Sequence, residues 1–273
     1  EYHLDGCSKA AAAIIERYKD QPFFLYLAYR GPHTPLDAPK RYMDRFPGEM
    51  TERRRTALAM LSAIDDGVGL ITSTLKKHGL TEKTLIFFIG DNGAPLKIHK
   101  VDSPLQGDPG GWDGSLNTPL NGEKGMLAEG GMSTPFLIAW PGTIPGGQVY
   151  EHPVSALDVA ATADGVQPLD DSEKSAKAST PTQRFDGHSI LPALKGDALA
   201  GKAVFQYFPH NPGVPDWLPP AVSVHRDDWK LIRIFHGGEK GAHRHLLFNL
   251  RVDLGEKNNL AAQKPELVTE LDA

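Results

Sequence analysis

LIFFIGDNG, residues 85–93, is the stretch that decides the fold of this 273-residue chain. Its first five residues form an apolar run of β-branched and aromatic types, too short for an independent helix, that ends at Gly90. Such a run predicts a strand buried on both faces. Asp91, Asn92 and Gly93 follow at the carboxyl end of this strand, where open α/β sheets bind ligands. Two interpretations stay open: a tight turn, or two hard oxygen ligands for Ca²⁺ or Mg²⁺.

Two more apolar runs end or begin at polar candidates. Residues 23–29 (FFLYLAY) lead into a proline-rich loop that holds His33, and residues 135–140 (PFLIAW) follow a glycine-flanked turn that holds Lys124. Between the strands, helices are predicted over residues 9–18 with Ser8 as the cap, 51–78 and 155–163. This order predicts an α/β fold with a mostly parallel central sheet flanked by helices.

The helix over residues 51–78 is the longest predicted element. Apolar residues recur every three or four positions and predict one buried stripe: Leu58, Leu61, Ile64, Val68, Ile71 and Leu75. Asp65 and Asp66 lie inside this helix, where adjacent side chains point about 100° apart and do not easily chelate one ion together. A solvated or capping role is expected for this pair.

The C-terminal part has a different pattern. Strands are predicted over residues 203–208, 221–225, 229–235 and 246–250, followed by a helix over 265–271. Consecutive strands after an α/β region predict a small antiparallel sub-domain. We therefore expect residues 1–200 to belong to an α/β catalytic domain and residues 201–273 to form this sub-domain.

Composition excludes several classes of protein. The chain is 40% hydrophobic, carries a net charge of −5 and has no Lys/Arg tract, which argues against a nucleic-acid partner. No apolar run approaches the ~18 residues of a membrane span. One cysteine excludes an internal disulfide and leaves the compartment open. The sequence begins with Glu1 and not Met, and no signal peptide is visible, so the natural start is expected upstream.

His33, the Asp91–Asn92 pair and Lys124 together have the chemistry needed to handle a tetrahedral oxyanion. A divalent cation and the Lys124 ammonium would offset charge on non-bridging oxygens. His33 would hydrogen-bond the ester or protonate a leaving oxygen, the alternative being a solvated loop histidine. We expect the three loops to converge at one rim of the sheet.

Taken in order, several segments resemble the sulfatase family of the alkaline-phosphatase-like superfamily. They are PFFL (22–25) with PHTP (32–35), GDNG (90–93), GEKG (122–125), EGG (129–131), WPG (140–142), DGHSIL (186–191), WKLI (229–232) and GEKNNL (255–260). The match runs nearly end to end, which is more specific than any single motif. It favours the metal-site interpretation of Asp91 and Asn92 over the turn.

The resemblance implies a role for each candidate. Asp91 and Asn92 correspond to the second half of the family's Ca²⁺ site, with Ca²⁺ favoured over Mg²⁺. His33 and Lys124 correspond to the histidine and lysine that contact sulfate. His210 resembles a position near the substrate pocket, and His99, in the long loop over residues 94–121, is a second substrate-binding candidate.

The substrate implied by the resemblance is a sulfate ester of a carbohydrate or an aryl alcohol. Trp112 and Trp217 suit stacking on a sugar. Family members are often exported, so a periplasmic or extracellular location is expected. The oligomeric state stays open.

The sequence departs from the family at the nucleophile. Sulfatases use a hydrated formylglycine made from a Cys/Ser-x-Pro/Ala-x-Arg motif, and this motif is absent; Cys7, in GCSKA, lacks the Pro and the Arg. The family's N-terminal aspartate pair is also absent, so the resemblance covers the C-terminal part of a sulfatase. Two alternatives remain: a phosphate or phosphonate ester hydrolase of the same superfamily, and a non-catalytic paralogue that binds anions. An upstream coding sequence with the missing motifs would favour the enzyme.

The 273-residue chain alone is expected to show no turnover of an aryl sulfate and only weak Ca²⁺ binding, because it lacks the nucleophile motif and half of the implied metal site. Phenol release and calorimetric Ca²⁺ titration measure these two properties. Robust multiple-turnover hydrolysis by the purified chain would contradict the prediction.

Overall fold

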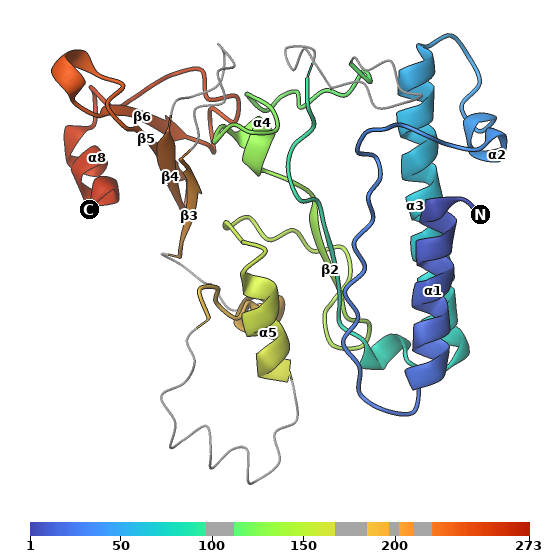
Figure 1. Cartoon of the computed structure of the whole chain (residues 1–273). Coiled ribbons are helices and arrows are strands. Elements are labelled where there is room, and N and C mark those ends of the chain that lie inside the picture. Colours follow the sequence, from blue (N-terminus) through green and yellow to red (C-terminus); the bar gives the residue numbers. More distant parts are fainter. Residues whose placement is uncertain (97–111, 167–184, 197–201, 210–219) are drawn as a thin grey trace, which may run out of the picture. The chain divides into compact units, whose positions relative to one another are not determined.

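The computed structural model describes residues 1–96, 112–166, 185–196, 202–209 and 220–273 (Figure 1). They belong to two compact units. The first unit comprises residues 1–86, 94–117 and 138–143, and the second comprises residues 87–93, 118–137 and 144–273. Three residues singled out from the sequence lie outside the described part: His99, His210 and Trp217.

Two helices dominate the first unit: α1 (His3–Tyr18) packs along α3 (Glu52–Lys77). Helix α3 begins where the sequence predicts, because the Thr51 hydroxyl accepts a hydrogen bond from the Arg54 N–H at 3.3 Å. Helix α1 begins earlier than predicted, and the assignment of Ser8 as its cap is wrong. Ser8 is buried inside the helix, where its hydroxyl donates to the Leu4 carbonyl at 2.9 Å.

The buried face of α3 is built largely from small residues. Ile64 and Leu75 are buried as predicted, but Leu61 is 45% exposed, so the predicted apolar stripe is only partly right. The other buried positions are Ala57, Ala59, Met60, Ala63, Gly67 and Thr74. Within the described part of the chain, α3 is also the one helix with the length and apolar composition of a membrane span, a property that core helices share.

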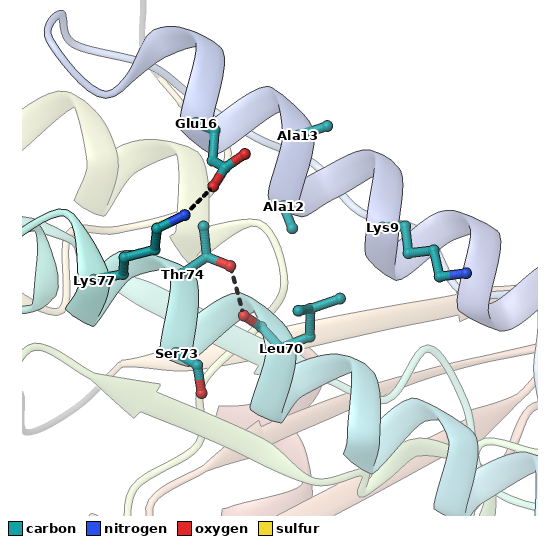
Figure 2. Close-up of a pocket in the computed structure, with 8 residues that line it drawn as sticks. All are labelled: Lys9, Ala12, Ala13, Glu16, Leu70, Ser73, Thr74 and Lys77. Carbon is teal, nitrogen blue, oxygen red and sulfur yellow. Dashed lines mark hydrogen bonds and ion pairs between the residues drawn. The ribbon is translucent and has the colours of Figure 1, made fainter.

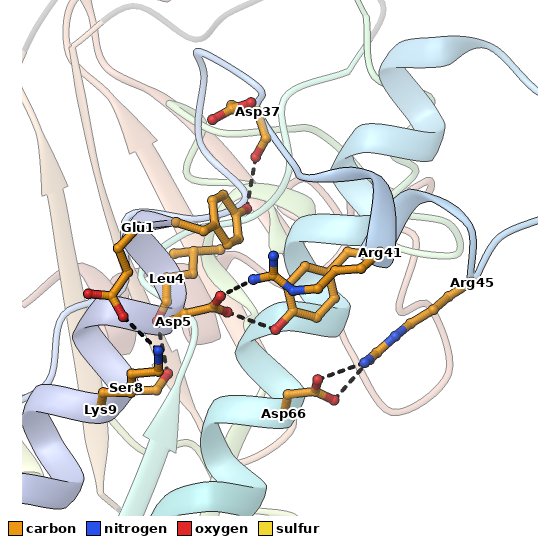
Figure 3. A network of polar contacts seen from close by, with 11 residues as sticks. Glu1, Leu4, Asp5, Ser8, Lys9, Asp37, Arg41, Arg45 and Asp66 are labelled. Atoms are coloured by element: carbon orange, nitrogen blue, oxygen red, sulfur yellow. Dashed lines mark hydrogen bonds and ion pairs between the residues drawn. The ribbon is translucent and has the colours of Figure 1, made fainter.

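A polar network attaches the short helix α2 (Lys40–Met43) and the residues after it to both long helices (Figure 3). Asp5 on α1 accepts a hydrogen bond from the Tyr42 hydroxyl at 2.7 Å and pairs with Arg41. Arg45 makes two bonds to Asp66 on α3, at 2.8 and 2.9 Å. The Arg41 and Arg45 guanidinium groups both lie over the Tyr42 ring, 4.8 and 4.7 Å from its centroid. Asp66 therefore serves an ion pair that fixes α2 in place.

A shallow groove runs between α1 and α3 (Figure 2). The Glu16 carboxylate accepts a hydrogen bond from the Lys77 ammonium at 2.6 Å, and this bond lowers the pKa of Glu16. Lys9, at the other end of the groove, pairs with Glu1 at 2.7 Å. None of the predicted site residues lines this groove.

Residues 23–29 differ from their prediction as a strand buried on both faces. In the described part of the chain they pair with no other strand, and their side chains alternate in exposure. Phe24 and Tyr26 are 77% and 81% exposed, whereas Leu25, Leu27 and Tyr29 are half-buried. The apolar run does not reveal that one face is exposed, and no strand forms over these residues.

The strands predicted on either side of the Lys124 turn are confirmed, but their predicted burial is wrong, since Phe88 and Leu137 are 44% and 57% exposed. β1 (Ile86–Ile89) and β2 (Phe136–Ala139) pair in a two-stranded sheet. The Phe87 and Phe136 rings meet edge to face at 6.2 Å. Short helices precede each strand: η1 (Thr81–Lys83) and α4 (Glu129–Met132).

The predicted C-terminal antiparallel sheet and helix are also confirmed. Four strands pair in the order β3 (Ala203–Phe208), β4 (Ala221–Arg226), β5 (Trp229–Ile234) and β6 (Arg244–Asn249). One face of this sheet packs on Leu127, and the other packs on α8 (Pro265–Asp272) through Leu271. Among the residues that the structure describes, the remaining helices are α5 (Asp158–Val166), α7 (Leu191–Leu194) and η2 (Glu239–Gly241). The domain boundary at residue 200 stays a prediction.

Two glycines of α3 provide a matched test of the close packing with α1. A Cβ on Gly67 would lie 2.2 Å from the Ser8 hydroxyl and 2.5 Å from the Tyr29 hydroxyl, whereas a Cβ on Gly69 meets nothing within 4 Å. Gly67→Ala should therefore destabilise the protein by about 1–3 kcal/mol. Gly69→Ala should stabilise it by about 0.5–1 kcal/mol through helix propensity. Urea unfolding measures both, and equal effects would contradict the proposed packing.

Candidate functional site

The loop that carries His33 is held at several points within the first unit. Gly31 packs tightly on the core, since a Cβ there would lie 3.0 Å from the Leu4 side chain and 3.3 Å from that of Met60. The His33 N–H donates to the Arg30 carbonyl at 3.1 Å. Further along the loop, the Tyr2 hydroxyl donates to the Asp37 carbonyl at 2.8 Å. These contacts fix the backbone while the imidazole stays exposed.

The His33 ring has one nitrogen occupied and one available. Nδ1 lies 2.7 Å from the Thr34 carbonyl oxygen. Because a carbonyl only accepts, Nδ1 carries the proton in this contact. Nε2 therefore accepts a hydrogen bond when the ring is neutral and donates one when the ring is protonated, which is the requirement for assisting a leaving oxygen.

Asp91 and Asn92 form a turn whose internal hydrogen bonds leave two oxygens free for a ligand. Asp91 Oδ1 accepts the Asn92 N–H at 2.9 Å, and Asn92 Nδ2 donates to the Gly93 carbonyl at 2.9 Å. In the described part of the chain, Asp91 Oδ2 and Asn92 Oδ1 have no such bond. The turn interpretation is therefore confirmed, and the ligand interpretation, which this geometry allows, stays a prediction.

Stacked glycine backbones connect this turn to the segment that carries Lys124. Four residues, which we call the glycine stack, make the contacts: Gly93, Gly122, Gly130 and Gly131. The Gly93 N–H donates to the Gly131 carbonyl at 2.9 Å, and the Gly130 N–H donates to the Asn121 carbonyl at 2.6 Å. A Cβ on Gly93 would lie 1.7 Å from the Gly130 carbonyl oxygen, and one on Gly130 would lie 2.2 Å from that of Gly122. Only glycine permits backbones to approach this closely.

Lys124 lies in the turn that begins at Gly122. Gly122 and Gly125 adopt positive φ angles of 84° and 89°, and the Met126 N–H donates to the Glu123 carbonyl at 3.0 Å. Glu123 is fully buried, whereas the Lys124 side chain is half-exposed. No carboxylate of the described residues lies within ion-pair distance of the Lys124 ammonium. The turn thus presents a cation that is free to meet an anion.

The structure brings together part of the predicted site. Asp91, Asn92 and Lys124 lie on segments that adjoin the glycine stack in the second unit, whereas His33 lies in the first unit. The convergence of His33 with the other three residues stays a prediction. His99 and His210 fall outside the described residues.

Asp91 and Asn92 have the donor chemistry for part, but not all, of the ligand set of an ion such as Ca²⁺. Ca²⁺ takes six to eight oxygen ligands, and Asp91 and Asn92 offer two hard oxygens side by side. In the described ranges, no group of three or more His, Cys, Asp or Glu side chains is arranged to hold a metal ion. A complete site therefore needs donors in addition to this pair.

The sequence interpretation missed a buried charged cluster beside the glycine stack. Lys230 on β5 is fully buried and pairs with Glu129 and Glu256. Burial raises the pKa of the Glu256 carboxyl, against the lowering influence of the Lys230 charge. The signal was present in Trp229–Ile232, where a lysine occupies a strand position between large apolar residues.

Solved structures of similar proteins identify the fold. Ps i-CgsB, solved in complex with k-i-k-neocarrahexaose, superposes with a TM-score of 0.77 and 30% identity, covering 99% of this chain and 53% of that one. This is the alkaline-phosphatase-like α/β fold with its antiparallel C-terminal sheet. The family model described as Sulfatase matches residues 7–165, and the chain belongs to the sulfatase family.

Curated relatives agree with this assignment. The uncharacterized sulfatase YdeN of Escherichia coli (strain K12) is 30% identical over 306 residues, covering 99% of this chain and 49% of YdeN. The N-acetylgalactosamine-6-sulfatase of Canis lupus familiaris is 32% identical over 188 residues, covering 68% of this chain and 31% of the relative. The chain thus spans half or less of the length of these two relatives.

The superfamily alternative has a counterpart among the solved structures. The phosphonate monoester hydrolase SpPMH from Silicibacter pomeroyi superposes with a TM-score of 0.61 at 19% identity, which shows a shared fold alone. The family match and the named relatives favour the sulfatase interpretation.

The glycine stack can be tested with two matched substitutions. Gly93→Ala places a methyl group against the Gly130 carbonyl, a backbone atom that cannot rotate away, and should cost about 1–3 kcal/mol or more. Gly146→Ala meets nothing within 4 Å and should change stability by less than about 0.5 kcal/mol. Thermal unfolding of both variants measures the difference, and a Gly93→Ala variant as stable as wild type would contradict the stack.

Proposed function

We propose that the complete protein hydrolyses sulfate esters and releases inorganic sulfate. One observation carries the proposal: in a chain of the sulfatase family, the glycine stack presents an acid–amide pair and a free lysine from adjoining backbone segments. These groups have the charges needed to bind a tetrahedral oxyanion next to a divalent cation.

The chain's own residues would divide the work as follows. The Lys124 ammonium would interact with non-bridging oxygens, whose negative charge it stabilises as the ester bond breaks. Protonated His33 would donate from Nε2 to the ester oxygen, while its Nδ1–H remains on the Thr34 carbonyl. Such a donor assists departure of an alcohol that leaves poorly as an alkoxide.

Sulfatases typically use a divalent metal ion. In this chain Asp91 and Asn92 would hold it, and Ca²⁺ fits their oxygen donors. When bound, the ion supplies positive charge next to the ester oxygens. Further ligands are needed beside this pair, and the formylglycine motif that supplies the family's nucleophile does not occur in this sequence.

A sulfated carbohydrate is the substrate class that we propose. The structure of Ps i-CgsB with neocarrahexaose and the named N-acetylgalactosamine-6-sulfatases support it by similarity. Within the second unit, a surface hollow of about 600 Å³ opens beside the Lys124 turn. It is lined by Thr118, Pro119, Leu120, Asn121, Gly255, Glu256 and Lys257. Its polar groups and size suit part of a sugar chain, while an exported location stays a prediction from the family.

Lys124→Ala in the complete gene product should lower turnover of an aryl sulfate by roughly 10²–10³-fold, because the lost charge faces the oxyanion. Thermal stability should change little, since the side chain is half-exposed and pairs with no described carboxylate. Steady-state kinetics and a melting curve measure the two effects. Lys195→Ala, which removes an exposed lysine of the same unit, is the control.

Unchanged kinetics in Lys124→Ala would remove this lysine from the site. Parallel assays with aryl phosphate and phosphonate esters that share the leaving group distinguish the superfamily alternative. Binding of sulfate by the wild-type complete gene product without turnover of any of these esters would favour the non-catalytic paralogue.

A further inference from the structure

A lysine ammonium is enclosed between two carboxylates beneath the glycine stack. Lys230 Nζ lies 2.7 Å from Glu129 Oε1 and 3.1 Å from Glu256 Oε1. The three side chains, which we call the Lys230 triad, are 0%, 8% and 1% exposed. Glu256 Oε2 also accepts the backbone N–H of Glu129 at 2.7 Å. Glu129 is therefore held both by its side chain and by its main chain.

Burying the three charged groups of the Lys230 triad costs free energy, so their presence in the core needs an explanation. Two carboxylates and one ammonium lose their hydration on burial, and an apolar cluster of similar volume often gives equal or greater stability. Glu256 also has a left-handed backbone conformation, with φ of 52°, which residues other than glycine rarely adopt. Stability alone is a weak explanation for these costs, whereas a requirement for one defined geometry accounts for them.

The triad includes Glu129, which directly precedes the glycines that pack against both segments of the candidate site. Glu129 is the first residue of α4, and Gly130 and Gly131 follow it directly. These two glycines contact Gly93, next to Asp91 and Asn92, and the backbone at Asn121 and Gly122, next to Lys124. A shift of Glu129 would therefore move the surface on which both site segments pack.

The other end of the triad is fixed by the antiparallel sheet. Lys230 lies opposite His225 on β4 and Phe248 on β6, so its backbone is paired on both sides. Ile232 and Ile234 of the same strand pack in the cluster that contains Leu127. The lysine thus extends from a rigid strand to a short helix between two site segments.

We propose that Lys230 is a positioning residue: through Glu129 and Glu256 it fixes the glycine stack and thereby the placement of Lys124 and the Asp91–Asn92 turn. The catalytic consequence rests on the proposed function, whereas the structural consequence does not. A residue that acts at one remove from a bound ion or substrate typically changes affinity or activity by about 10- to 100-fold.

The test compares two buried lysines of the second unit in the complete gene product. Lys230→Met removes the centre of the triad. Lys202→Met removes an ammonium that is 9% exposed and pairs with Asp158, a residue that takes no part in the contacts of the glycine stack. Both variants should melt at a lower temperature. When the enzyme concentration is corrected for the folded fraction, only Lys230→Met should lower kcat, by about 10- to 100-fold.

Amide hydrogen exchange supplies a readout that is independent of activity. Peptides covering residues 88–96 and 121–133 should exchange faster in Lys230→Met and at the wild-type rate in Lys202→Met. If the wild type hydrolyses no sulfate ester while this exchange difference appears, the proposed function fails and the positioning role stands. If both kcat and exchange of these peptides are unchanged in Lys230→Met, the positioning role is wrong.

A second variant covers the case in which Lys230→Met does not fold. Lys230→Met/Glu129→Gln/Glu256→Gln removes all three charges, so no unpaired charge is buried and the melting temperature should recover. Faster exchange at residues 121–133 with lowered kcat in this variant supports the positioning role. Wild-type exchange and kcat in this variant would overturn it.

Discussion

Close approach of main chain to main chain is the constraint on which the candidate site depends. Gly93, Gly130 and Gly131 leave no room for a Cβ, because carbonyl oxygens occupy that space, and a Cβ on Gly122 would meet the side chains of Ala128 and Met126. The N–H groups of Gly93 and Gly130 donate across the same contacts, so these backbone polar atoms are satisfied as the segments meet. The charged side chains at the adjoining turns, Asp91 and Lys124, are thereby held by rigid backbone and not by one another.

The first unit uses a different method to hold His33. Here a small-residue helix contact and a surface network position the helices around the loop. Gly67 allows α1 to approach α3, and Arg41, Tyr42 and Arg45 attach α2 to both (Figure 3). The imidazole then depends on its own neighbour, the Thr34 carbonyl, for the orientation of its ring. His33 is thus held by contacts of the first unit, whereas Asp91, Asn92 and Lys124 are held by the glycine stack.

Local patterns in the sequence predicted much of this structure, since they encode local physics. The apolar run before Asp91 predicted β1, Thr51 predicted the start of α3, and the short link before Trp229 predicted the β4–β5 hairpin. Patterns that depend on distant partners failed. Residues 23–29 look buried by composition although Phe24 is open, and Ser8 looks like a cap although the helix extends past it.

The same dependence on distant partners explains which residues of the candidate site could be predicted from the sequence. Asp91, Asn92 and Lys124 stand next to glycines and strand ends, and family resemblance assigned their roles. Lys230 was missed, because its partners Glu129 and Glu256 lie 101 and 26 positions away in the printed sequence. Ion pairing over such separations cannot be inferred from periodicity, and only the folded chain shows that these charges meet.

A scaffold held by backbone atoms has a consequence for how such proteins diversify. Since the closest neighbours of a Cβ on Gly93, Gly130 and Gly131 would be main-chain atoms, exposed side chains at the edges of the stack can change without disturbing these contacts. The glycines themselves admit no stepwise route to another residue, and Asp91, Asn92 and Lys124 are limited by the chemistry proposed for them. Variation is therefore expected at the exposed positions around these residues and not within the stack.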